Sequence, residues 1–332
     1  MKYYRQWFAL TALLLTLTST TSLCFAQNQT FVINKPIKIV VGFPPGGSAD
    51  ALARVLAQQL GGVAPSVIVE NKPGAGGRIA VESVKNSEAD GATLLLTPAS
   101  MMAVYPHIYK KLPYDPVNDF APVGTVAAAP FVIAVGPMVP ADVKTLADFV
   151  KWSKTNPTKA SYGTSGAGSI PHFTGVALGK RLDLDWTHIA YKGAAPAMND
   201  LLAGQVAANV SVLSNALPHI QAGTLRALAI SAPQRSSALP NVPTFMESGA
   251  KEETAVEWFG VFVPAKTQSD VVLKLNQAVN NAVRSKQFSE TLAKAAFESV
   301  LPDTPSTFAA NLKSEIARWG RIVKVSGFTP ED

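Results

Sequence analysis

Short apolar runs rich in β-branched residues alternate along the chain with segments in which apolar residues recur every three or four positions. The short runs predict strands and the amphipathic segments predict helices. Because helices separate many of the runs, the pattern predicts an α/β fold with mostly parallel sheets. The nine expected strands are 37–43, 67–70, 93–97, 131–135, 160–163, 187–191, 208–213, 225–231 and 259–263.

Helix ends are marked at three places. Thr145 with Asp148 has the spacing of a capping box, and Thr267 with Asp270 repeats it. An apolar stripe between 308 and 323 predicts a long C-terminal helix that ends at Gly327.

The N-terminus has the three-part pattern of a secretory signal peptide. Lys2 and Arg5 are followed by an apolar run over 7–17, and a small-x-Ala cleavage site ends at Ala26. The run is shorter than the roughly 20 residues of a membrane-spanning helix, which argues against an anchor. We therefore expect residues 1–26 to be a cleaved signal peptide and the mature protein to lie in the periplasm.

A lipoprotein is the alternative, although Leu23 before Cys24 is not a small residue. Cleavage would remove the only cysteine, so the mature chain could form no disulfide. It would also lower the formal net charge from +6 to +4. That mild excess favours anionic solutes, and without a Lys/Arg cluster it predicts no nucleic-acid partner.

The catalytic motifs that we sought do not occur in the sequence. Ala167 follows Ser165 where a nucleophile elbow needs glycine. The four histidines lack metal-ligand spacing, so we expect no metal, no cofactor and no enzymatic activity. A secreted hydrolase that uses Ser165 or Ser48 with a histidine stays open, because a triad can assemble in space.

Glycine-rich turns between a strand and a helix are the candidate binding elements. In the first loop, two glycines allow close approach to a ligand, and the following helix start favours an anion. In the third loop, side-chain hydroxyl groups and backbone amides could together bind a carboxylate. The turn at 71–77 between them could be structural or could contact the ligand. The candidate residues are Phe43, Gly46, Gly47, Ser48, Ala49 and Asp50 in the first loop and Tyr162, Thr164, Ser165, Gly168 and Ser169 in the third.

The chain resembles the Bug-type periplasmic receptors, which are the solute-binding components of tripartite tricarboxylate transporters. The likeness covers nearly the whole mature chain, and its specificity comes from several motifs in one order. The matching stretches are 36–47, 69–77, 112–123, 191–196, 220–229 and 239–244.

The resemblance implies a type II periplasmic-binding-protein fold, in which two α/β lobes are joined by two crossing strands. We expect lobe 1 to comprise 27–125 and 257–332, and lobe 2 to comprise 126–256. The crossing strands would lie near 126–135 and 258–263, with 225–231 as the alternative return.

The family's function implies capture of a small carboxylate between the first and third loops. The ligand would be a dicarboxylate, a tricarboxylate or an aromatic carboxylate. We expect a monomer that binds transiently to membrane transporter subunits; a sensor subunit feeding a signalling receptor is the alternative.

Specificity would come from a distal pocket formed by Ser100, His172, Tyr191 and Ser211. Ser211 stands where the family often has Asp, so we expect no negative group in the cleft and no ammonium on the ligand. Arg78 replaces a family Asn and could reach a second carboxylate or cover a helix start.

Overall fold

The computed structural model describes residues 33–250 and 255–330. The expected signal peptide, 1–26, lies outside these residues. The described residues belong to one compact unit. Within the described ranges, no helix combines the length and the apolar character needed to cross a membrane.

The first half of the chain builds a parallel sheet. Strand β1 (Ile37–Val41) pairs in parallel with β2 (Val67–Asn71) and with β3 (Thr93–Pro98). The helices of this part are α2 (Ser48–Gln59), α3 (Arg78–Lys85) and α4 (Tyr105–Ile108), with the turns η1 (Ala75–Gly77) and η2 (Ser100–Val104). We call these elements, with the C-terminal helices described below, the first lobe.

The second lobe repeats the strand-helix alternation. Its parallel strands are β5 (Ser161–Thr164), β6 (Thr187–Ala190) and β7 (Ala208–Val212), with β5 in the middle. The remaining elements are α5 (Leu146–Thr155), α6 (Ile170–Leu182), α7 (Ala194–Leu202), α8 (Leu213–Gln221) and β8 (Arg226–Ile230).

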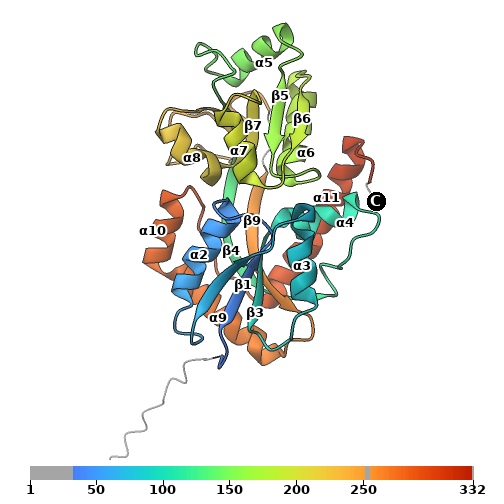
Figure 1. The fold of residues 1–332 in the computed structure, drawn as a ribbon, viewed down its shortest axis with the longest axis vertical. Helices are drawn as coiled ribbons and strands as arrows, with labels where there is room; N and C mark the ends of the chain where they lie inside the picture. Colours follow the sequence, from blue (N-terminus) through green and yellow to red (C-terminus); the bar gives the residue numbers. More distant parts are fainter. Residues whose placement is uncertain (1–32, 251–254, 331–332) are drawn as a thin grey trace, which may run out of the picture. The chain divides into compact units, whose positions relative to one another are not determined.

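Two long strands join the lobes (Figure 1). Strand β4 (Phe120–Val135) pairs with β9 (Val256–Pro264) along its first part and with β7 and β8 along its last part. Strand β9 also pairs with β3, so the sheet order is β2-β1-β3-β9-β4-β7-β5-β6. The exact lobe boundaries stay a prediction.

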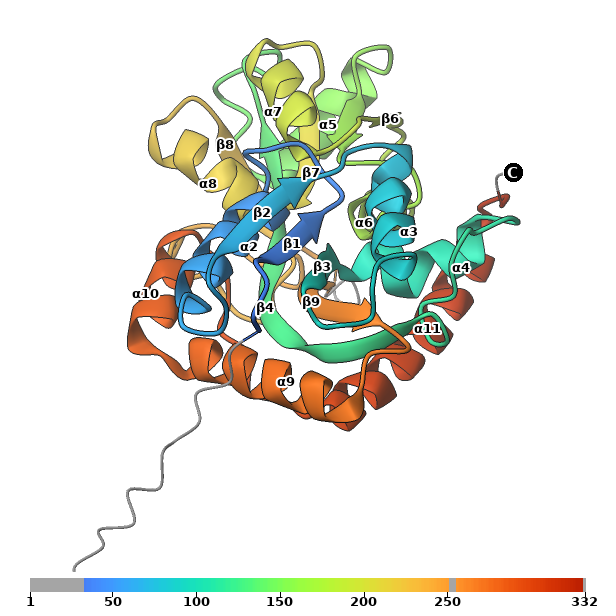
Figure 2. The same ribbon diagram turned by 60° about the horizontal axis from the view of Figure 1, so that its bottom comes forward.

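Three C-terminal helices return to the first lobe. Helices α9 (Ser269–Arg284) and α11 (Pro305–Ser326) both contact β4, and α10 (Lys286–Lys294) contacts α2. In the turned view, α9, α10 and α11 lie around the strands of this lobe (Figure 2). Buried Leu275 and Val279 of α9 and Phe308 and Trp319 of α11 supply the apolar faces.

All nine predicted strands are present, but the expectation of mostly parallel sheets is wrong. Among the described strands, four pairings are parallel and four are antiparallel. The antiparallel pairings all involve β4 or β9, because strands that cross between lobes run against the parallel strands they join.

Two of the three predicted helix ends are confirmed and one is wrong. Thr145 and Asp148 form the capping box of α5, and Gly327 ends α11 with a φ of 79°. The second capping box is wrong, because α9 begins at Ser269 after Gln268, which makes no side-chain cap.

Candidate functional site

A pocket lies between the two lobes, at the starts of α2 and α6. Its walls are aromatic, proline and small residues, and its polar atoms come from both lobes. The cavity volume is about 40 Å³, which holds only a few water molecules. A solute of several carbon atoms therefore needs the lobes to move apart before it enters. The lining residues are Phe43, Pro44, Gly47, Ser48, Ala49, Pro98, Ser100, Tyr105, Ser165, Ser169, Pro171, Ala194, Ser211, Val212, Asn215, Glu257 and Phe259.

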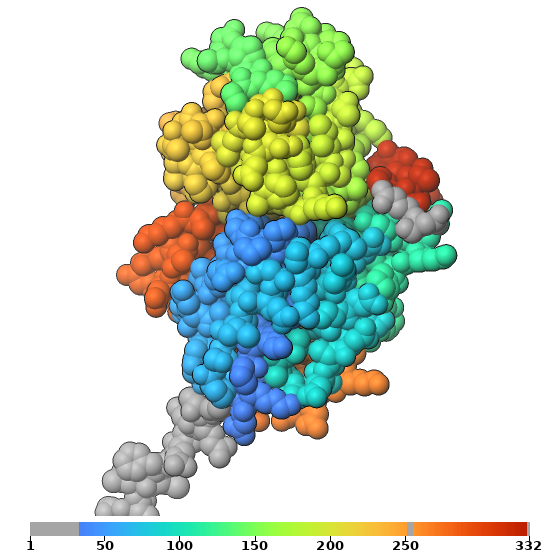
Figure 3. Space-filling view, viewed as in Figure 1, coloured from blue at the N-terminus to red at the C-terminus, as the bar shows by residue number. Residues whose placement is uncertain are grey.

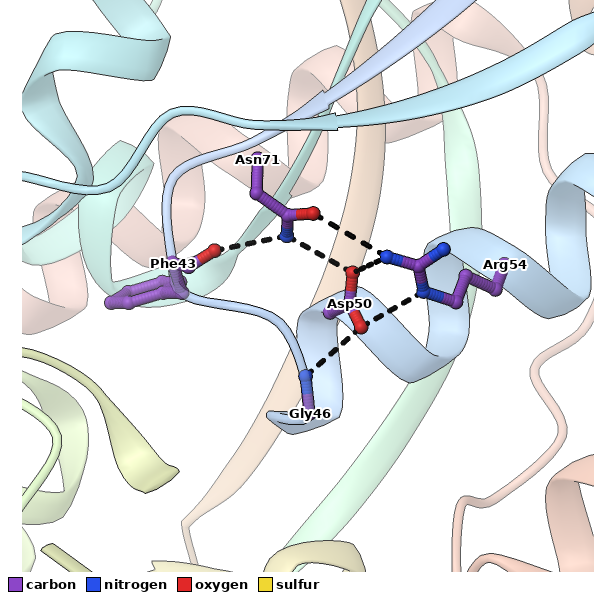
Figure 4. Close-up of polar contacts among 5 residues, drawn as sticks. All are labelled: Phe43, Gly46, Asp50, Arg54 and Asn71. Atoms are coloured by element: carbon purple, nitrogen blue, oxygen red, sulfur yellow. Dashed lines mark hydrogen bonds and ion pairs between the residues drawn. The ribbon is translucent and has the colours of Figure 1, made fainter. Parts of the chain in front are cut away.

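The first loop is held in shape by Asp50, which is buried in the first turn of α2 (Figure 4). Its carboxylate accepts hydrogen bonds from the Gly46 amide, the Asn71 amide group and the Arg54 guanidinium, all at 2.9–3.0 Å. Burial acts to raise the pKa of Asp50, but these hydrogen bonds outweigh it and the pKa lies below its ordinary value. Gly46 has a φ of 90°, which favours glycine.

The third loop is held by its own polar groups. Ser169 donates to the Gly166 carbonyl at 2.7 Å, and the Gly168 amide donates to His172 Nδ1 at 3.0 Å. Thr164 is fully buried, and its hydroxyl lies 2.8 Å from His188 Nε2. These contacts fix the loop at the start of α6.

Helices α2 and α6, which begin at the pocket, each receive a hydrogen-bond acceptor from the opposite lobe. The Ser48 amide of α2 donates to Asn215 Oδ1 of α8 at 2.9 Å. The Ile170 amide of α6 donates to Ser100 Oγ of η2 at 3.0 Å. Neither helix has a side-chain cap from its own N-cap residue. The lobes are therefore closed, and in the space-filling view the surfaces near α2 and α7 meet directly (Figure 3).

Glu257 of β9 is the one carboxylate among the described residues that line the pocket. The Ser100 amide donates to its Oε1 at 3.2 Å, and the Ser100 hydroxyl lies 3.4 Å from both carboxylate oxygens. Burial raises its pKa to about 8 despite these donors, and the negative charge of Glu315 adds to the effect. We expected no negative group in the cleft; the cleft does contain the acidic residue Glu257, although its raised pKa keeps most of the carboxyl uncharged at neutral pH.

Ser211 of β7 also lines the pocket, and its buried hydroxyl has no hydrogen-bond partner. A buried hydroxyl without a partner is costly, so it is a natural contact for a solute. Phe43 and Phe259 provide the apolar walls. The pocket thus offers neutral donors, one buried acid and apolar surface, and the part of its lining that the structure describes contains no lysine, arginine or histidine.

The structure brings together about half of the residues predicted from the loops. Phe43, Gly47, Ser48, Ala49, Ser100, Ser165, Ser169 and Ser211 line the pocket. Gly46, Asp50, Tyr162, Thr164, Gly168, His172 and Tyr191 do not line it.

Several residues outside the lining support the second lobe. Tyr162 stacks on Trp186 at 4.2 Å in the core of this lobe, and Tyr191 donates to Asp200 at 2.8 Å. His172 and His188 stack on each other at 3.8 Å, and their imidazoles bond Gly168 and Thr164. The two imidazoles bond Gly168 and Thr164 rather than Ser48 or Ser165. Their contacts therefore give no support to the hydrolase alternative.

The second glycine-rich turn has a packing role. Tyr105 donates to the Gly76 carbonyl at 2.8 Å, and a Cβ at Gly77 would collide with Met101. The guanidinium of Arg78 donates to the Ala75 carbonyl and lies over the Tyr109 ring. Arg78 therefore covers the start of α3.

Sequence reasoning missed Asn215 and Glu257. Glu257 did carry a signal, since it is a lone carboxylate in the apolar strand Val256–Pro264 and shares a strand face with Phe259. No sequence signal pointed to Asn215, because its contact with Ser48 exists only when the lobes meet. Over the described residues, no cluster of acidic residues, histidine or cysteine is suited to a metal ion.

Known proteins match the chain along most of its length. The tripartite tricarboxylate transporter family receptor profile matches residues 49–328. Protein BugT of Bordetella pertussis is 36% identical over 295 residues, which cover 88% of this chain and 90% of BugT.

Two solved structures share the architecture. The periplasmic binding protein BugD is 32% identical with a TM-score of 0.83, covering 89% of this chain and 99% of BugD. The R. palustris protein Rpa4515, solved with adipate, is 30% identical with a TM-score of 0.85, covering 89% and 98%.

These matches give the two joined lobes their fold class, the α/β periplasmic-binding-protein fold. The profile match and the relationship to BugT show that the chain belongs to the tripartite tricarboxylate transporter receptor family, whose Bug-type receptors it resembles in sequence and structure.

Proposed function

We propose that the protein is a periplasmic solute-binding protein that captures a small carboxylate for a tripartite tricarboxylate-type transporter. The signal-peptide pattern at 1–26 supports secretion. The family match supports solute binding, and the adipate-bound relative supports a carboxylate. Capture is binding without chemistry, so the protein is not an enzyme.

The observation that carries this proposal is the pair of helix starts at one pocket. Amides at the start of a helix point outward and favour an anion. Here α2 and α6 present such amides from opposite lobes, and each is capped across the cleft by a neutral acceptor. A ligand carboxylate would take the place of these acceptors.

Binding would then be coupled to lobe closure. A solute that contacts both lobes stabilises the closed arrangement relative to the open one. The amides of Gly47, Ser48 and Ala49 and the hydroxyls of Ser165 and Ser169 are the proposed contacts. The residues behind the pocket, Asp50 and Thr164 among them, would hold the two loops in place. The closed form, as a monomer, would be the one the transporter binds.

The first test is a thermal-shift screen of the purified protein against di- and tricarboxylates, acidic amino acids, nicotinate and benzoate-type acids. Binding to the native state raises the melting temperature by mass action. A shift with one class of acid supports the proposal. A panel without any shift, on protein unfolded and refolded to release copurified solute, contradicts it.

Two variants test the site. In Gly47→Val, the added methyl groups face Ala194 across the cleft, so we expect binding to weaken at least tenfold. Gly62→Val is the matched control, because it lies beyond the other end of α2 in open space. Ser169→Ala removes a pocket hydroxyl, and Ser87→Ala removes a similar hydroxyl bonded three residues back but outside the pocket. Equal binding by test and control variants contradicts the site.

A further inference from the structure

The charge balance of the pocket restricts the second functional group of the ligand. One ligand carboxylate would face the starts of α2 and α6. The other polar groups that line the pocket include Glu257, Ser100, which accepts the Ile170 amide, and the unpartnered hydroxyl of Ser211. Among the described residues that line the pocket, no lysine, arginine or histidine is present to neutralise a second negative charge.

A buried charge is stable only when it is paired and hydrogen-bonded. A dicarboxylate would place its second negative charge beside the Glu257 carboxyl in a pocket that offers only neutral donors. A ligand with one carboxylate and one ammonium would instead form an ion pair with Glu257. The sum of ligand and pocket charges then remains near −1, opposite two helix starts that favour an anion.

We propose that Glu257 is the specificity-determining residue of this pocket and selects zwitterionic carboxylates, which pair a carboxylate with an ammonium group, over dicarboxylates. The inference rests on the proposed function and narrows its ligand class. Ser100 has a positioning role, because its amide and hydroxyl hold the Glu257 carboxyl while its oxygen accepts the Ile170 amide.

Ionisation of Glu257 makes the selection depend on pH. Its pKa of about 8 keeps most of the carboxyl protonated at neutral pH, and an ammonium must displace that proton. Among charged neighbours, Glu315 of α11 raises the pKa further and is itself bridged by Arg318 at 3.2 Å. In the pairing of β4 with β9, the residue opposite Glu257 is Ala129, which has no titratable side chain.

Titratable side chains on elements beside the pocket include His172 and Tyr105. His172 of α6 has its pKa lowered to about 4 by burial, so it stays neutral between pH 6 and 8. Tyr105 of α4 donates its hydroxyl proton to the Gly76 carbonyl. The pH response of ligand binding in this range is therefore assigned to Glu257.

The test is calorimetric titration with matched pairs of probes that differ in one end group: glutarate against 4-aminobutanoate, and adipate against 5-aminopentanoate. The expected result is tighter binding of the ammonium member of at least one pair. Between pH 6 and pH 8 its affinity should rise roughly 50-fold, as the ionised fraction of a group with a pKa of about 8 rises.

The Glu257→Gln variant should bind the ammonium probe at least about tenfold more weakly and lose the pH response. Glu298→Gln is the control, since this exposed glutamate does not line the pocket and bridges Ala128 only through its backbone. Preference for the dicarboxylates, unchanged in Glu257→Gln, overturns the inference and leaves the proposed function intact. Failure of every probe and of the broader acid panel overturns both.

Discussion

The side chain of Asn215 accepts the Ser48 amide at 2.9 Å, so a residue of α8 caps the first turn of α2 in the other lobe. Ser100 does the same in the opposite direction for Ile170 of α6. Each lobe therefore supplies the cap that the other lobe's helix lacks, and closure without a solute satisfies the amides that a carboxylate would bind.

The first prediction concerns this cap. Asn215→Ala should lower the free energy of unfolding of the ligand-free protein by about 1 kcal/mol, the usual value of a helix cap. Solution scattering should also show a larger radius of gyration, because the ligand-free lobes lose a contact that closes them. Asn199→Ala in the adjacent α7, whose side chain is exposed, is the control. Unchanged stability and scattering in Asn215→Ala would contradict the role of the cap.

The second prediction separates the two members of the Asp50–Arg54 ion pair. Asp50 is 4% exposed and accepts three donors, whereas the Arg54 side chain is 52% exposed. Asp50→Ala leaves the Gly46 amide without an acceptor and removes one of the two acceptors of the Asn71 amide group, so it should cost about 2–3 kcal/mol. Arg54→Ala should cost less than about 1 kcal/mol, because exposed ion pairs contribute little.

Denaturant titrations measure the loss of stability in both variants, and ligand titrations measure how far the change in the first loop weakens binding. We expect Asp50→Ala to weaken binding and Arg54→Ala to leave it within about threefold. Equal destabilisation by the two variants would show that Asp50 does not organise the first loop.

The third prediction uses a close approach between lobes. Gly168 has a φ of 67°, and a Cβ there would collide with Ile108 of α4 in the first lobe. Gly168→Ala should therefore oppose closure and weaken ligand binding, besides costing about 1 kcal/mol for the backbone conformation. Gly223→Ala has the same positive φ in open space and isolates the backbone cost.

Ile108→Val removes the terminal methyl group that the new Cβ would meet. In the Gly168→Ala background, this second change should restore binding but not the backbone cost. A double variant that binds no better than Gly168→Ala would rule out the steric explanation.

The local sequence pattern was sufficient to predict the strands and the loops that precede α2 and α6. Periodicity and glycine positions depend on neighbours in the chain, so 43–50 and 162–169 could be selected before any tertiary contact was known. The pattern could not show which loop residues face inward. Thr164 and His172 looked equivalent to Ser165 and Ser169, yet their polar atoms are used within the second lobe.

Contacts between residues far apart in the sequence could not be predicted, for a different reason. Asn215 meets Ser48 across 167 positions, and Glu257 meets Ser100 across 157. The antiparallel direction of the crossing strands, which brings Glu257 of β9 beside the first lobe's η2, follows from topology and not from any local signal.

The fourth prediction concerns acid stability. Burial lowers the pKa of His172 to about 4 and of His188 to about 3, and in His188 the neighbouring His172 adds to the shift. Between about pH 6.5 and pH 4 the unfolded chain binds protons at both imidazoles that the folded protein does not, so stability falls as the pH falls. Thermal melting across this range should show the loss, and His188→Gln should make it shallower. His219→Gln, outside the stacked pair, should match the parent protein.

The fifth prediction concerns alkaline stability and has the opposite sign. With a folded pKa of about 8 against an ordinary value of 4.5, Glu257 keeps a proton that the unfolded chain has released. Its contribution to stability is therefore complete below about pH 4.5 and is lost as the pH rises through about 8. Glu257→Gln, which stays neutral, should gain stability relative to the parent protein by a few kcal/mol between pH 5 and pH 9. Glu82→Gln, on the exposed side of α3, should show no such gain. If the parent protein and Glu257→Gln unfold with the same pH dependence in denaturant, the Glu257 carboxyl is already ionised in the empty pocket, and binding of an ammonium ligand would then release no proton.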